Sequence, residues 1–158
     1  MSRLVCFLFV VICGASTTPN RRTGIQGIQS SIEIVENIED YLQENHVSTL
    51  TKLNVVRTAE KISHQVGTRI YGDRLVAMET DSKTSSIPID VALTLRYPSA
   101  GAMMPGAIVT LVDITVDQSV NVGNAYIKAG GIGQRYIEIL VVAKNTMYFH
   151  YKAEIYGM

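Results

Sequence analysis

The stretch that decides the fold is "YIKAGGIGQRYIEI", residues 126–139, in which three glycines stand between two apolar runs. A phosphate-binding loop requires a helix directly after its glycines, because the helix N-terminus faces the anion. Here Gly133 is followed closely by the β-branched, strand-like run YIEILVV, and Tyr136 stands where the third glycine of a Gly-x-Gly-x-x-Gly motif would be. The segment therefore predicts a tight hairpin turn between two strands, with glycine supplying the positive φ.

Alternating apolar residues on either side of this turn predict further strands. Every second residue is apolar in "IPIDVALTLRY" (87–97) and in "MYFHYKAEIY" (147–156), and a period of two indicates a strand with one buried face. The run "YIEILVVA" (136–143) is apolar on both faces, as expected for a central strand covered on both sides. Turn residues separate these runs, at Pro98–Gly106, Asn121–Asn124, Gly130–Gly133 and Asn145-Thr146. Short strands at this spacing predict a mainly β fold, an antiparallel β-sandwich or barrel-like sheet over residues 66–158.

The segment before this β-rich domain, residues 28–65, has a different pattern and is predicted to be helical or irregular. Apolar residues recur there at helical spacing: Ile28, Ile32, Val35, Ile38 and Leu42. They predict an N-terminal amphipathic helix. Its other face carries only acids: Glu33, Glu36, Glu39, Asp40 and Glu44. Such a run is either a solvated face or a docking surface for a basic partner, which would use Glu36, Glu39 and Glu44. A second helix within residues 47–64 is also compatible with the pattern.

Residues 1–16 are predicted to be a signal peptide. Arg3 precedes an apolar run of 10 residues, and small residues follow at Gly14, Ala15 and Ser16. The run is half the length of roughly 20 residues that a membrane-spanning helix needs, and no other segment is long and apolar enough to span a membrane. Both cysteines lie inside the leader, so the exported chain would contain none. Residues 17–27, polar with Pro and Gly, are expected to form a flexible arm.

Charge and motif content argue against several classes of function. The 14 basic and 14 acidic side chains balance and the basic ones are scattered, so direct binding of nucleic acid is not expected. The three histidines are far apart in the sequence and show no metal-ligand spacing. Asp113 and Asp117, on one strand, would lie ~13 Å apart, too far for a glycosidase pair. Arg69 and Asp73 are expected to form a structural ion pair. We therefore expect no catalytic residue, metal or cofactor.

Several separated motifs resemble one insect family, the multiprotein bridging factor 2 family. They are "GDRLV" at 72–76, Tyr97-Pro98, "VDITVDQSVNVGNAYIKAGGIG" at 112–133 and "EIYG" at 154–157. The resemblance implies two roles. The member that gave the family its name is a transcription coactivator that bridges a DNA-bound regulator and the general transcription machinery. Other members, including the lepidopteran response-to-pathogen proteins, are small secreted proteins of gut, saliva or haemolymph. The resemblance implies no catalytic residues.

Three functional hypotheses follow. The first is a secreted, non-enzymatic protein that acts by protein or surface binding, linked to a gut, salivary or immune response. Its candidate contact face consists of Tyr148, His150, Lys152 and Tyr156, although this face could instead pack against a second layer of the fold. The second hypothesis is a nuclear transcription coactivator that docks a basic partner on the acidic helix. The third is a small-ligand carrier, which would need a β-barrel with an open apolar cavity.

Overall fold

The computed structural model describes residues 27–47, 50–58 and 61–158. The predicted signal peptide, and all of the predicted arm except Gly27, lie outside the described residues. The chain forms one antiparallel sheet of eight strands with one short helix near its start, which confirms the predicted fold class. The elements are β1 (Gln29–Val35), α1 (Ile38–Glu44), β2 (Thr51–Lys52), β3 (Asn54–Arg57), β4 (Ile62–Gly67), β5 (Arg74–Tyr97), β6 (Val109–Gln118), β7 (Gly123–Gly130) and β8 (Ile137–Gly157).

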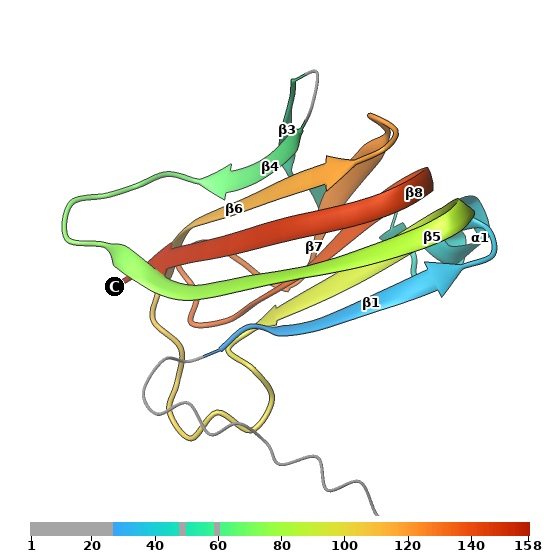
Figure 1. Cartoon of the computed structure of the whole chain (residues 1–158). Coiled ribbons are helices and arrows are strands. Elements are labelled where there is room, and N and C mark those ends of the chain that lie inside the picture. The colour runs from blue at the N-terminus through green and yellow to red at the C-terminus, as the bar shows by residue number, and fades with distance from the viewer. Residues whose placement is uncertain (1–26, 48–49, 59–60) are drawn as a thin grey trace, which may run out of the picture.

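Two long strands, β5 and β8, fold this sheet into two layers (Figure 1). In the front layer, the second half of β8 lies between the first half of β5 and β6, and β4 and β3 follow β6. In the back layer, the first half of β8 lies between the second half of β5 and β7, with β1 and β2 at the edges. Both long strands bend at the end of the molecule where α1 begins.

The core lies between the two layers. Odd-numbered residues of β8 face this core both before and after the bend of the strand. Ile137, Ile139 and Val141 from the back layer pack in the same buried cluster as Phe149 and Tyr151 from the front layer. Tyr97 and Phe149 are the largest of the fully buried side chains. Burial of each such side chain stabilises the fold by about 1.5–3 kcal/mol.

The opposite face of the back layer is covered by α1. Leu140 and Val142 of β8 pack there with Ile38 of the helix, in a second and smaller cluster. Residues 139–143 of β8 are therefore buried on both faces, as predicted, whereas Tyr136 precedes the strand and is exposed.

The predicted helix from Ile28 to Leu42 is wrong in its first half. Residues 29–35 form β1, which pairs antiparallel with β5 from Gln29 opposite Arg96 to Val35 opposite Asp90. The helix begins only at Ile38, where the Asn37 side chain accepts a hydrogen bond from the Glu39 N–H at 2.9 Å. The spacing of the apolar residues fits a helix, but backbone pairing with the edge of β5 prevails over that local preference.

The second helix considered for residues 47–64 is also wrong, because this segment contains β2, β3 and the start of β4. Sheet structure thus begins well before residue 66, and β4 pairs with β6 throughout its length.

The turn predicted at Asn145-Thr146 does not end a strand. Asn145 adopts a φ of 56°, and β8 continues through it. In the second half of β5 the buried face starts at Ile89, since Ile87 is 64% exposed, whereas Ala77 is buried in the first half.

The glycine-rich stretch joins β7 to β8 as an antiparallel hairpin, as predicted, and no helix follows it. Gly130 has a φ of 68°, and a Cβ atom added there would lie 2.2 Å from the carbonyl oxygen of Tyr136. Only glycine fits this position, because both the backbone conformation and the close approach of the opposite strand exclude a side chain.

Candidate functional site

The four residues proposed as a contact face lie on the outer side of the front layer. Tyr148, His150 and Lys152 are exposed and Tyr156 is half-buried, whereas the intervening residues of β8 from Phe149 to Ile155 point into the core. The alternative that this face packs against a second layer is therefore wrong: the odd-numbered residues of the strand make that contact. We call the side chains of Tyr148, His150, Lys152, Glu154 and Tyr156, with their cross-strand neighbours, the outer face.

Close contacts organise the side chains of the outer face. The rings of Tyr148 and His150 are tilted by 50° with centroids 5.5 Å apart. Lys152 Nζ lies 2.8 Å from Glu154 Oε1. The Arg69 guanidinium lies 4.1 Å from the centroid of the Tyr156 ring, a cation–π contact. The face thus presents aromatic rings beside charges of both signs.

Polar residues of the neighbouring strands extend this face. In the sheet register, Thr115 of β6 and Thr80 of β5 lie on either side of Lys152. Asp113 lies opposite Glu154 and accepts a hydrogen bond from the Ser63 hydroxyl of β4 at 3.0 Å. Four adjacent strands therefore contribute to one surface, which suits contact with a macromolecule.

The loop between β4 and β5 fixes the end of the outer face. Arg69 and Asp73 form the expected ion pair at 2.7 Å, so that prediction is confirmed. Asp73 also accepts hydrogen bonds from the Ile70 N–H at 3.0 Å and the Thr110 hydroxyl at 2.8 Å. Burial alone would raise the pKa of the Asp73 carboxyl, but the hydrogen bonds from Ile70, Arg69 and Thr110 outweigh it and lower the pKa. The ionised carboxylate thereby holds Arg69 where it can stack on Tyr156.

Residues 66–157 match the protein-family model described as "Transcription activator MBF2". The chain belongs to the MBF2 family. The match covers more than half of the chain and agrees with the extent of the sequence resemblance. Neither a curated protein nor a solved structure matches the chain.

Most of the outer face lies within the region that matches the MBF2 model. This region contains β5 to β8 and the last residues of β4, and it excludes β1, α1, β2 and β3. Tyr148, His150, Lys152, Tyr156 and Arg69 all belong to it. The sequence indicated four of these residues and the pair of Arg69 with Asp73, but not the contact of Arg69 with Tyr156, because that contact joins residues far apart in the chain.

The three acidic candidates lie elsewhere on this MBF2 family member. Glu36 precedes α1, Glu39 lies in its first turn and Glu44 is its last residue, and all three are exposed. The Lys144 ammonium forms an ion pair with Glu39, and this hydrogen bond is the main reason why the pKa of Glu39 is lowered. Because α1 covers the back layer, the acidic residues and the outer face lie on opposite layers and cannot form one site.

The histidines are not brought together. His150 is exposed on the outer face, whereas His64 of β4 is buried with no hydrogen-bond partner for its Nδ1 atom. Burial lowers the pKa of His64 to about 4, and the positive charges of Arg57 and Lys52 add to this effect. Within residues 27–47, 50–58 and 61–158, no three His, Cys, Asp or Glu side chains are grouped so that they could hold a metal ion. No helix in the same part of the chain is long and apolar enough to cross a membrane.

Proposed function

We propose that this protein is an exported, non-enzymatic binding protein whose protein partner docks on the outer face. Within the described residues, no element packs over Tyr148, His150 and Lys152, which makes this face available to a partner. This exposure is the observation that supports the proposal most directly. The predicted leader supports export, and the resemblance to secreted members of the family supports a role in a gut, salivary or immune response.

The composition of the outer face favours a protein as the partner. Tyrosine contributes large contact area at low entropic cost, and it is enriched at the energetically dominant positions of interfaces. Tyr148 lies beside His150, and the Lys152–Glu154 pair offers both a donor and an acceptor for charged groups of a partner. Mixed charges of this kind give specificity and register more than they give affinity.

Export is tested by expression of the full chain in insect cells with a C-terminal tag, followed by N-terminal sequencing of protein from the medium. We expect a new N-terminus after Ala15 or Ser16. Protein that stays in the nucleus and retains Met1 would refute the export part of the proposal.

Binding is tested by a quantitative capture experiment with gut and haemolymph extracts. The wild-type protein is compared with the double variant Tyr148→Ala/Lys152→Glu and with the control Tyr136→Ala/Lys61→Glu. The control makes the same chemical changes at exposed positions in the turns that precede β8 and β4. We expect a partner that the wild type and the control retain at equal levels and that the outer-face variant loses. A partner retained equally by all three proteins would place the contact elsewhere.

A second candidate function is transcription coactivation. The description of the matching family model names a transcription activator, and α1 presents exposed acids that could dock a basic partner. Glu39 is already paired with Lys144, so Glu36 and Glu44 are the carboxylates best able to bind one. A pull-down with a basic transcription factor should then be abolished by Glu36→Lys/Glu44→Lys. Unchanged binding by this variant would argue strongly against docking through α1.

A further inference from the structure

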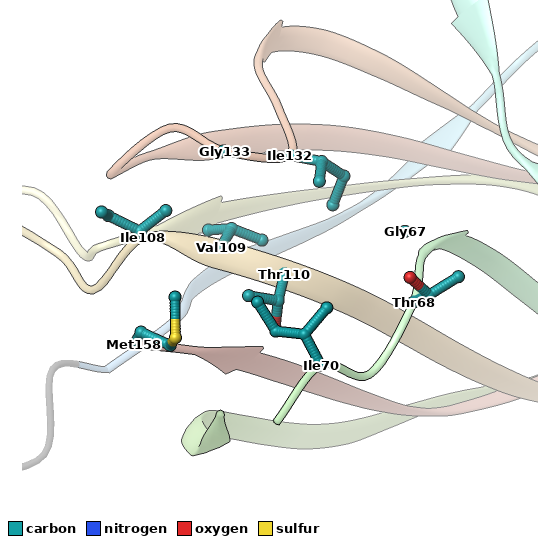
Figure 2. Close-up of a pocket in the computed structure, with 9 residues that line it drawn as sticks. All are labelled: Gly67, Thr68, Ile70, Ile108, Val109, Thr110, Ile132, Gly133 and Met158. Carbon is teal, nitrogen blue, oxygen red and sulfur yellow. The ribbon is translucent and has the colours of Figure 1, made fainter. Parts of the chain in front are cut away.

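An apolar pocket of about 210 Å3 opens at the end of the molecule where β4 ends and β6 begins (Figure 2). Its walls come from four separate segments of the chain: the start of the β4–β5 loop, the start of β6, the β7–β8 turn and the last residue, Met158. No local pattern in the sequence indicates this pocket, because segments from residue 67 to residue 158 meet only in the folded sheet.

The pocket offers hydrocarbon and almost no free polar group. Its backbone groups are hydrogen-bonded across the walls, from Thr68 N–H to Thr110 O at 3.1 Å and from Gly133 N–H to Val109 O at 2.8 Å. The Thr110 hydroxyl donates to Asp73 outside the pocket. None of the lining side chains carries a charge. A polar ligand group would therefore lose its hydrogen bonds to water on entry, whereas an aliphatic group would gain from burial.

The size and depth of the pocket favour the end of a slender chain. Val109, which is fully buried, and Thr110 line its inner part, while Ile70, Ile132 and Met158 are 40–51% exposed and line its mouth. The volume is smaller than the about 300–1,000 Å3 of sites that enclose drug-sized ligands. An apolar cavity of roughly 150 Å3 is nevertheless large enough to bind a benzene-sized molecule.

We propose that this pocket binds the hydrocarbon end of a small aliphatic amphiphile, with the polar head of the ligand left in solvent. The site is distinct from the outer face, and it differs from the interior cavity that a barrel-type carrier would use. The interior between the two layers is filled by side chains such as Tyr97 and Phe149.

The proposal is tested by NMR titration of the protein with butan-1-ol, hexan-1-ol and octan-1-ol. We expect saturable shifts of the amide signals of Thr68, Thr110 and Ile132. Each added methylene that is buried should tighten binding about fourfold. Shifts that do not saturate, or that spread evenly over exposed apolar residues of the whole surface, would overturn the proposal.

A pair of variants separates the pocket from general surface adsorption. Ile132→Asn places an amide at the mouth, and Val56→Asn makes the corresponding change at an exposed aliphatic residue of β3. Both residues are exposed, so both variants should fold. We expect Ile132→Asn to weaken octan-1-ol binding by at least about fivefold, because a polar group replaces apolar wall, and Val56→Asn to leave it unchanged. Equal effects of the two variants would contradict a defined site.

The role of the head group is tested by comparison of octanoate with octan-1-ol. No charged side chain lines the pocket to pair with the carboxylate of octanoate, and the terminal carboxylate of Met158 would repel it, so octanoate should bind no more tightly than octan-1-ol. Binding of octanoate without binding of octan-1-ol would mean that an ionic contact, and not this pocket, holds the ligand. That result would overturn the proposal.

Discussion

Mild acid should destabilise this protein through a single buried side chain, His64. Its pKa is about 4 in the folded state, compared with about 6.5 for an exposed histidine. The unfolded state therefore binds a proton more readily than the folded state between these two values. The contribution of His64 to stability is complete above pH 6.5 and is lost as the pH falls towards 4.

The size of the effect follows from the difference between the two pKa values. A pKa difference of about 2.5 corresponds to about 3 kcal/mol of stability, of which about 2 kcal/mol should already be lost at pH 5. This is a large fraction of the about 5–15 kcal/mol that stabilises a typical domain. Solvent screens this effect little, because His64 is only 1% exposed.

The test is urea unfolding followed by circular dichroism at several pH values between 7.5 and 5, since the chain contains no tryptophan. His64→Leu keeps an apolar side chain in the core but cannot titrate, so it should lose about 2 kcal/mol less than the wild type over this range. His150→Gln removes an exposed histidine and should behave like the wild type. If the wild type and His64→Leu lose the same stability on acidification, the reasoning about burial is wrong.

Three further predictions concern the fold. Asp90 accepts hydrogen bonds from the N–H of Ile38, the first residue of α1, at 3.0 Å and from the N–H of Asn145, at the bend of β8, at 2.8 Å. Asp90→Ala should therefore lower the free energy of unfolding in urea by about 1–3 kcal/mol and speed hydrogen exchange in α1. Gly133→Ala should lower the free energy of unfolding by about 1–2 kcal/mol, because of the positive φ alone. Gly130→Ala should lower it clearly more, because the added Cβ would also meet the backbone of the opposite strand, and equal losses for the two variants would refute this clash. Phe149→Ala should cost about 3–5 kcal/mol, measured as a lower urea midpoint, and a loss below 1 kcal/mol would mean that the core repacks around the cavity.

The sequence predicted most accurately those strands that have one buried face and one exposed face. The alternation from Phe149 to Ile155, and from Ile89 to Tyr97 except at Ala92, matches the observed burial, because a period of two is a property of the strand itself. At residues 29–35 the spacing of the apolar residues also fits a helix, and the prediction of a helix there was wrong. There the choice depended on the free edge of β5, which is not visible in the local sequence.

The sequence also indicated the outer face, but it could not show that this face is open. Tyr148 and His150 alternate with buried residues, and the pattern alone does not say whether another layer covers them. The acidic residues were correctly expected to be exposed, yet Glu33 proved to lie on β1, and Glu39 is paired with Lys144 from the far end of the chain.

The amino-acid sequence by itself determined the β class, the hairpin at the glycines and membership of the MBF2 family, because each depends on local pattern or on motifs that can be read in order. Tertiary structure alone decided that β5 and β8 run through both layers, that His64 is buried and that four segments enclose an apolar pocket. These features arise from strand pairing between residues that are distant in the chain. The free energy of such pairing depends on which surfaces meet, and no short window of sequence contains that information.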